Sequence, residues 1–241
     1  MILAAGVGSR LKPLTDARPK ALIEINGRPM LEIIARRLMA AGVTEIIVNV
    51  HHFPGLIADY LAKNKNFGLR VEISREETLL DTGGGLKKAA WFFDDGQPFF
   101  LHNVDIINNI DLTRMYGEHR QTGAWATLAA EKRISGRYLL FNQTGNLCGH
   151  EKNDGRGEVA ALRTKEGERL AFNGVHVISP ALLNGLAESG AFSIIDAYLR
   201  LAAQGTKILA FRTDGCWSQD IGTLEKLDAA ERYIGKKGFP G

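Results

Sequence analysis

The sequence predicts an α/β protein in which helices flank a mostly parallel, doubly wound sheet. In the first half of the chain, short apolar runs alternate with segments whose apolar residues recur at helical spacing. This alternation is typical of βαβ units, which build parallel sheets. Hydrophobic residues make up 45% of the 241 residues, which is enough for a large buried core.

In the first half, a Pro near the start and a Gly at the end delimit one helix clearly, at Pro29 and Gly42. The expected strands are 1–5, 45–50, 69–74, 98–104 and 124–130. The expected helices are 29–42, 56–63, 85–93 and 112–121.

The pattern changes near Arg133, after which short strands are separated by Gly and Asn turns. The expected strands are 138–141, 157–164, 172–179, 207–213 and 216–222, and the expected helices are 180–186, 195–203 and 223–234. The second half therefore extends the same sheet and adds an antiparallel flap.

Composition excludes several classes of function. A formal net charge of +3 is too mild for a nucleic-acid-binding protein. No apolar run is long enough to span a bilayer, and the N-terminus lacks the basic leader of a signal peptide. The two cysteines, Cys148 and Cys216, show no disulfide or zinc spacing. We expect a cytoplasmic protein without nucleic-acid or membrane partners.

A glycine turn follows the first strand, with Gly6 and Gly8 in it and Arg10 and Lys20 after it. Glycines let backbone N–H groups approach phosphate oxygens, and the two cations would bind such an anion. A tight turn without a ligand is the alternative. Leu11 stands where a dinucleotide fingerprint needs its third glycine, and no Gly-Lys-Ser/Thr follows, which argues against a dehydrogenase and a P-loop phosphotransferase.

A second glycine-rich stretch, "DTGGG", runs into a helix. Free backbone donors and the helix dipole would favour an anion or a polar base edge at Thr82, Gly83 and Gly84. A turn in which Thr82 caps the helix is the alternative.

Aspartates end two apparent strands, Asp105 after "FFLHNV" and Asp220 in "CWSQDIG". In a parallel sheet, ligands bind at the carboxyl ends of strands. Each aspartate alone could be a turn or cap residue. Together, in a chain with a phosphate-type loop, they predict Mg²⁺, which binds through one or two carboxylates and substrate phosphates.

These residues resemble the sugar-1-phosphate nucleotidyltransferases. The similarity follows Leu-x-Ala-Gly-x-Gly-x-Arg-Leu-x-Pro-Leu-Thr and then Pro-Lys-x-Leu, from Leu3 to Leu22. It continues through "DTGGG", Asp105, "FNGVHVISP" and "DIGTLEKL". The chain departs from the family pattern in two places, with Asn-Val-Asp for Asn-Gly-Asp and Trp-Ser-Gln-Asp for Trp-x-Asp.

The resemblance implies a three-layer, Rossmann-like mixed sheet flanked by helices, the nucleotide-diphospho-sugar transferase fold, with a small antiparallel sugar-binding flap. It implies a single domain, 1–241, with a nucleotide-binding half (1–132) and a sugar-phosphate-binding half (133–241). The implied reaction joins an NTP and a sugar 1-phosphate, with Mg²⁺ as cofactor, and gives an NDP-sugar and pyrophosphate.

The resemblance also assigns roles to residues. Those implied to be catalytic are Arg10, Lys20, Asp105 and Asp220, of which the two aspartates hold the metal. Those implied to bind the nucleotide are Ala4, Ala5, Gly6, Gly8, Arg10, Lys20, Thr82, Gly83 and Gly84. The candidates for the sugar are Asn103, Glu158, Asn173 and Gly174, with a surface strand position as the alternative for Glu158.

The identity of the sugar and base rests on resemblance alone. "DTGGG" is similar to the Glu-Thr-Gly-Gly-Gly of family members that use UTP with N-acetylmuramate 1-phosphate in cell-wall (peptidoglycan) recycling. GTP with mannose 1-phosphate, or a related hexose or heptose phosphate, is the alternative. A non-catalytic nucleotide-sugar sensor is the alternative of another class, and it would be expected to lose Lys20 or an aspartate. The sequence leaves a homodimer open.

Overall fold

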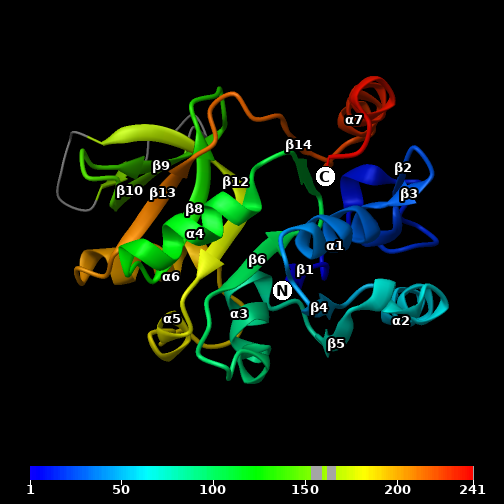
Figure 1. Cartoon of the computed structure of the whole chain (residues 1–241), viewed down its shortest axis with the longest axis horizontal. Coiled ribbons are helices and arrows are strands. Elements are labelled where there is room, and N and C mark those ends of the chain that lie inside the picture. Colours follow the sequence, from blue (N-terminus) through cyan, green and yellow to red (C-terminus); the bar gives the residue numbers. More distant parts are fainter. Residues whose placement is uncertain (153–158, 162–166, 241) are drawn as a thin grey trace. The chain divides into compact units, whose positions relative to one another are not determined.

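The computed structural model describes residues 1–152, 159–161 and 167–240 (Figure 1). The chain folds into two compact units, each built from separate chain segments. The first unit contains Met1–Leu80, His102–Thr113 and Cys216–Gly241, and the second contains Asp81–Leu101 and Arg114–Gly215. The expected halves, 1–132 and 133–241, stay a prediction.

The first unit is built on parallel strands in the order β6–β1–β4–β5. These strands are β1 (Ile2–Leu3), β4 (Glu45–Val50), β5 (Arg70–Arg75) and the end of β6 (Phe99–Asn103). In register, Ile2 lies opposite both Val48 and His102, so β1 lies between β4 and β6. Five of the six residues of β4 are buried, as its apolar run predicts.

Three helices belong to the first unit: α1 (Met30–Ala40), α2 (Pro54–Lys63) and α7 (Leu224–Lys237). α1 begins directly after Pro29 and ends before Gly42, whose φ of 90° stops the helix as expected. A small ribbon, β2 (Glu24–Ile25) with β3 (Arg28–Pro29), precedes α1.

Sequence analysis did not predict the second two-stranded ribbon of this unit. β7 (Ile106–Asn108) pairs antiparallel with β14 (Ser218–Asp220). Sequence analysis predicted a strand near 216–222 but no strand after Asp105, because three residues are too short for a periodic pattern. This ribbon brings chain segments more than 100 residues apart side by side, and it positions the site described below.

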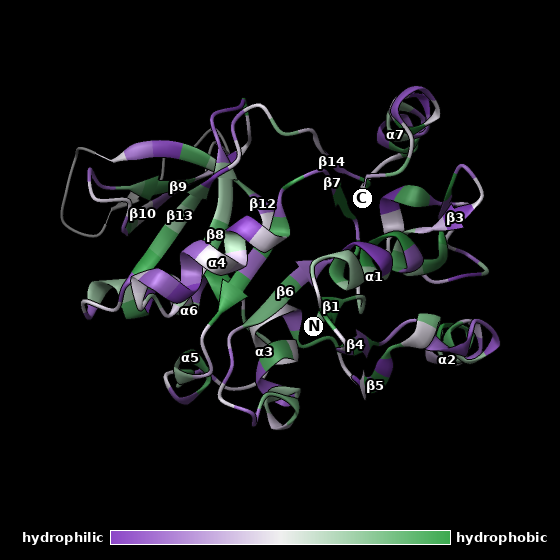
Figure 2. Ribbon diagram, in the orientation of Figure 1, coloured by the Kyte–Doolittle hydropathy of each residue, from purple (hydrophilic) through white to green (hydrophobic). Residues whose placement is uncertain are grey.

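The second unit is mainly antiparallel, which confirms the expected flap. Its strands are β8 (Ala126–Glu131), β9 (Arg137–Phe141), β10 (Leu147–Lys152), β11 (Val159–Ala161), β12 (Glu168–Ile178) and β13 (Ile208–Arg212). β11, β10, β9 and β12 pair antiparallel in that order, β8 pairs antiparallel with β12, and β13 runs parallel to β8. Figure 2 shows β8 and β13 as mainly hydrophobic, whereas α4 carries hydrophilic turns.

The remaining helices are α3 (Asp81–Lys88), α4 (Leu112–Thr122), α5 (Ala181–Asn184) and α6 (Ile194–Ala203). Short 3₁₀ turns cover Ser9–Leu11, Lys20–Leu22, Lys65–Gly68 and Ala90–Phe92. The expected helix 85–93 is wrong in its bounds, because the glycines lie in the first turn of α3 and the aromatic residues follow it. No helix among the described residues is both long and apolar enough to cross a membrane.

Candidate active site

The turn after β1 is shaped by Gly8. Its φ is 66°, in the left-handed region that favours glycine. A Cβ placed there would stand 2.9 Å from Cγ2 of Thr15 and 3.1 Å from Cβ of Lys20. The Thr15 hydroxyl also donates to the Gly8 carbonyl at 3.0 Å. Gly8 is therefore needed so that the turn can pack directly against Lys20.

Neither the backbone conformation nor packing requires a glycine at Gly6. Its φ is not in the left-handed region, and no described atom lies within 4 Å of the place a Cβ would take. The residue is exposed. A side chain here would point into open space, so packing within the described chain does not require this glycine.

Buried polar residues hold the backbone by hydrogen bonds at the point where the chain leaves β1. The backbone N–H of Ala4 donates to Oδ1 of Asn49 at 2.7 Å, and Asn49 Nδ2 donates to Oε1 of Glu76 at 2.6 Å. Glu76 Oε2 also accepts the N–H of Leu80 at 2.9 Å. Asn49 and Glu76 are both buried. His51 Nδ1 donates to the Glu76 carbonyl at 3.0 Å.

Lys20 and Asp105 form an ion pair within the first unit. The Lys20 side chain is 11% exposed and that of Asp105 is 26% exposed. A largely buried ammonium needs such a carboxylate partner, because removal from water penalises an isolated charge. Sequence analysis placed both residues in the site, and the structure brings them into direct contact.

Arg10 and Asp220 meet at Gly222. A Cβ on Gly222 would stand 3.0 Å from Oδ1 of Asp220 and 3.1 Å from Nη2 of Arg10. The other carboxylate oxygen of Asp220, Oδ2, accepts from Nζ of Lys226 at 2.8 Å. Asp220 therefore pairs with Lys226 of α7, and Arg10 of the glycine turn also lies next to Gly222.

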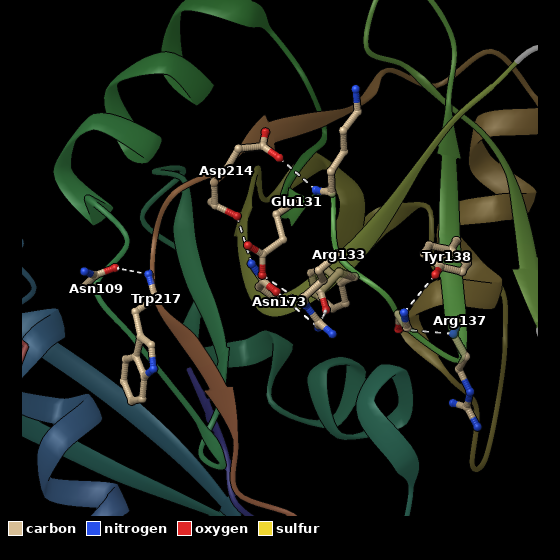
Figure 3. A network of polar contacts seen from close by, with 12 residues as sticks. Asn109, Glu131, Arg133, Arg137, Tyr138, Asn173, Asp214 and Trp217 are labelled. Carbon is tan, nitrogen blue, oxygen red and sulfur yellow. Dashed lines mark hydrogen bonds and ion pairs between the residues drawn. The ribbon is translucent and has the colours of Figure 1, made fainter. Parts of the chain in front are cut away.

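The β7–β14 ribbon brings the two aspartates to the same end. Asp220 lies opposite Ile106 in the register, and the N–H of Ile221 donates to the carbonyl of Asp105 at 2.8 Å. At the other end of the ribbon, the N–H of Trp217 donates to Oδ1 of Asn109 at 2.7 Å (Figure 3). Backbone pairing thus holds Asp105 and Asp220 at adjoining positions.

The chemistry of this group fits a hard divalent cation. Carboxylate oxygens are the ligands such ions prefer, and two of them suffice when substrate phosphates complete the shell. Oδ1 of Asn103, two residues before Asp105, is buried and has no hydrogen-bond partner among the described residues. No cluster of three or more His, Cys, Asp or Glu suited to a metal occurs in the part of the chain that the structure describes. Asp105 and Asp220 fit a metal ion that substrate phosphates would also bind.

Arg37, Asn108 and His102 form a hydrogen-bonded network of buried polar side chains. Arg37 on α1 donates to Oδ1 of Asn108 at 2.6 Å and to the carbonyl of Ile110 at 2.6 Å. Asn108 Nδ2 lies 3.3 Å from Nε2 of His102, whose Nδ1 donates to the Asn103 carbonyl at 2.8 Å. Burial lowers the pKa of His102 to about 3 and that of Arg37 to about 10. The histidine is therefore neutral and the arginine charged at pH 7.

The second unit contains the "DTGGG" residues, and their contacts are internal. The N–H groups of Gly83 and Gly84 donate to the carbonyl of Phe192 at 2.9 and 3.3 Å. A Cβ on Gly83 would lie 2.3 Å from the Phe192 ring. The Thr82 hydroxyl accepts from the N–H of Ile194, so Thr82 contacts the start of α6 rather than capping its own helix. These donors are thus already used, and nucleotide binding by the three residues stays a prediction.

Asn173 and Gly174, expected near the sugar, lie in β12 where its register with β8 shifts. Asn173 is fully buried, and its Nδ2 donates to the Thr213 hydroxyl at 2.9 Å. Its Oδ1 accepts from the half-exposed Arg133 at 3.4 Å, and Arg133 also pairs with Glu131 at 3.1 Å (Figure 3). Glu158 lies outside the described residues. The sugar contacts therefore stay predictions.

Sequence reasoning missed Lys226, Asn49 and Glu76. A signal existed for each of the first two. Lys226 stands in the first turn of a helix, where a positive charge is unfavourable. Asn49 is a polar residue inside the otherwise apolar strand "EIIVNV". Glu76 follows a strand in a polar stretch and carries no comparable signal.

The first unit therefore has the features of an enzyme that handles phosphorylated nucleotides with a metal ion: a glycine turn, three cations and two carboxylates at strand ends. A family model described as nucleotidyl transferase matches residues 1–136. The chain belongs to the nucleotidyl transferase family, which confirms the expected family. Enzymes of this family generally depend on a divalent metal.

Individual relatives agree with this assignment. The chain is 34% identical to the N-acetylmuramate alpha-1-phosphate uridylyltransferase of Caulobacter vibrioides, over 96% of this chain and 95% of that protein. It is 37% identical to a mannose-1-phosphate guanyltransferase of Gibberella zeae, over 55% of this chain and 37% of that protein. A UDP-glucose pyrophosphorylase structure from Acinetobacter baumanii has a TM-score of 0.79 at 18% identity and covers 98% of this chain and 92% of its own, which confirms the expected fold.

Proposed function

We propose that this protein transfers the uridylyl group of UTP to a sugar 1-phosphate, with N-acetylmuramate 1-phosphate as the expected acceptor. The observation that carries the proposal is the convergence of Arg10, Lys20, Asp105 and Asp220 in one unit of a nucleotidyl transferase. The full-length similarity to a uridylyltransferase of this specificity supports the choice of base and sugar.

In the proposed reaction, an oxygen of the sugar phosphate attacks the α-phosphorus of UTP in line. A new oxygen–phosphorus bond forms, the bond from the α-phosphorus to its bridging oxygen breaks, and pyrophosphate leaves with those electrons. The residues of the site position two anions that repel each other and stabilise the charge that develops on the leaving group. No covalent bond to the protein is required.

The charges of the first unit support this role. Arg10, Lys20 and Lys226 supply three positive charges and Asp105 and Asp220 two negative ones, which leaves +1 for a polyanion. In our proposal Arg10 and the N–H groups around Gly6 and Gly8 bind the β- and γ-phosphates. Lys20, held by Asp105, lies near the reacting phosphates.

Asp105 and Asp220 would hold Mg²⁺, which supplies charge neutralisation at the phosphate oxygens. In the same proposal, Ala4 and Ala5 lie beside the base, with Thr82, Gly83 and Gly84 as further base contacts and Asn103, Asn173 and Gly174 as sugar contacts. The N–H of Ala4 donates to Oδ1 of Asn49, which fixes the backbone at this position.

The test is pyrophosphate release from UTP, GTP, CTP and dTTP, each with N-acetylmuramate, mannose or glucose 1-phosphate and Mg²⁺. Release with UTP and N-acetylmuramate 1-phosphate is the expected result. Lys12→Ala is the matched control for Lys20→Ala, because Lys12 is an exposed lysine of the same loop paired with Asp16. Release only with GTP and mannose 1-phosphate would favour the second specificity, which the 37% identity over 134 residues to a mannose-1-phosphate guanyltransferase supports. Release with no pair would favour a nucleotide-sugar sensor.

A cytoplasmic location and a homodimer remain predictions. Cell fractionation tests the first, and light scattering of the purified full chain tests the second.

A further inference from the structure

Lys226 occupies a place that its own helix does not explain. α7 begins after Thr223, whose hydroxyl oxygen accepts the N–H of Lys226 at 3.4 Å. Lys226 is the third residue after this cap, where glutamate usually completes a capping box. The partial positive charge of a helix N-terminus also disfavours lysine there. A lysine at this position therefore needs a reason outside α7.

Its partner supplies that reason. Nζ of Lys226 lies 2.8 Å from Oδ2 of Asp220, one of the two carboxylates assigned to the metal. Both side chains are partly exposed, at 42% and 38%. The pair is therefore in contact with water. The ammonium of Lys226, on its flexible four-carbon side chain, can leave the pair at a small cost in free energy. The other oxygen of Asp220 faces Gly222 and Arg10.

We propose that Lys226 is a mobile third cation of the phosphate site: it holds Asp220 until a divalent cation takes that carboxylate, and it then binds a phosphate oxygen of the substrates. This rests on the proposed function. An ammonium and a divalent cation repel each other and compete for Oδ2. Once displaced, the ammonium carries an uncompensated charge next to bound phosphates, which are its strongest available acceptors.

The proposal predicts that removal of Lys226 changes metal binding and phosphate binding in opposite directions. Without substrate, Lys226 competes with the metal, so its removal should strengthen metal binding. With phosphates present, Lys226 adds a contact, so its removal should weaken their binding. A lysine that only supported the fold would leave both affinities unchanged or weaken both.

The experiment compares the full chain with Lys226→Met, Lys226→Arg and Lys236→Met. Lys236 is an exposed lysine in the last turn of the same helix and is the matched control. Mn²⁺ binding is followed by electron paramagnetic resonance, and binding of pyrophosphate and of N-acetylmuramate 1-phosphate by calorimetry with Mn²⁺ present. These two probes distinguish a nucleotide phosphate from a sugar phosphate as the acceptor.

We expect Lys226→Met to bind Mn²⁺ alone about two- to fivefold more tightly, the range for loss of a half-exposed ion pair. We expect it to bind at least one of the two phosphate probes about fivefold or more weakly. Lys226→Arg and Lys236→Met should bind Mn²⁺ as the unchanged protein does. Unchanged or weaker Mn²⁺ binding in Lys226→Met, or unchanged binding of both phosphates, would overturn the proposal.

Measurements on the protein without substitutions distinguish a failure of the proposed function from a failure of the role proposed for Lys226. If the unchanged protein forms a nucleotide sugar but Lys226→Met fails the tests above, only the role of Lys226 is wrong. If it neither binds Mn²⁺ nor releases pyrophosphate with any substrate pair, the proposed function fails and the role of Lys226 fails with it.

Discussion

The two units use their polar residues in different ways. In the first unit, the assigned side chains form ion pairs, of which Lys226 with Asp220 is partly exposed and Lys20 with Asp105 is more deeply buried. In the second unit, the assigned groups are satisfied internally, as in Asn173 with Thr213 and Gly83 with Phe192.

This difference separates residues that can exchange partners from residues that cannot. The partly exposed ion pair of Lys226 with Asp220 is worth little in water, so a phosphate or a metal can replace one partner. A buried amide whose donors and acceptors are all used would leave an unsatisfied group if it turned toward a ligand. We therefore expect substitutions in the first unit to change turnover and those in the second to change stability first.

The largest expected effect is that of Lys20→Ala on turnover. Loss of this charge should lower kcat about 10²–10³-fold, the range for one preorganised charge stabiliser. Lys12→Ala, on the same loop, should leave kcat unchanged. Pyrophosphate release measures both. Near-normal turnover of Lys20→Ala would reject the assignment.

Next in size is the contrast between Gly83→Ala and Gly6→Ala. A methyl group on Gly83 would overlap the Phe192 ring, so this variant should lose about 1–3 kcal/mol of unfolding free energy. Gly6 has open space around it, so its variant should stay within about 0.5 kcal/mol but bind UTP more weakly. Urea unfolding and UTP titration give the two readouts. Equal stability losses in both variants would break the comparison between units.

Each unit contains a buried histidine that should make the free energy of unfolding depend on pH. Burial lowers the pKa of His102 to about 3 and that of His119 to about 4, from 6.5 in the unfolded chain. Between pH 6.5 and these values the unfolded chain binds more protons than the folded chain. Stability should therefore fall as the pH falls through this window, by up to about 1.4 kcal/mol per pH unit for each histidine.

His102→Gln and His119→Gln should each reduce this slope, measured by urea unfolding at pH 4.5 to 7. A slope that neither substitution alters would contradict the assignment of these two histidines.

The smallest expected effect compares two helix caps. Thr223 caps α7 in the first unit, and Ser193 caps α6 in the second. Each alanine variant should lose about 1 kcal/mol of unfolding free energy. Only Thr223→Ala should also lower turnover, because α7 carries Lys226. Thermal unfolding and pyrophosphate release test this pair, and a loss of turnover in Ser193→Ala alone would reverse the expectation.

Much of the fold could be predicted because it rests on local patterns. "EIIVNV" became β4 and the segment between Pro29 and Gly42 became α1, since apolar periodicity and end signals agree there. The ribbon of β7 and β14 could not be predicted, because it depends on pairing between residues more than 100 positions apart.

The candidate site divides in the same way. Lys20 and Asp105 were predicted from the glycine turn and the strand end, and the structure brings them together. Lys226 was missed because its role depends on which carboxylate the start of α7 approaches. The glycines of "DTGGG" were expected to offer free donors, but the carbonyl of Phe192, over 100 residues away, accepts from two of them. Sequence patterns identify chemically unusual residues, whereas partners distant in the chain decide how they are used.

The most direct measurement is a double-mutant cycle of Mn²⁺ binding with Asp105→Asn, Asp220→Asn and the double variant. If the two carboxylates share one ion, the unchanged protein binds one Mn²⁺ at this site, each single variant loses most of that affinity, and the double variant loses little more. Losses that simply add, or single variants that still bind Mn²⁺ as the unchanged protein does, would contradict a shared metal and with it the proposed site.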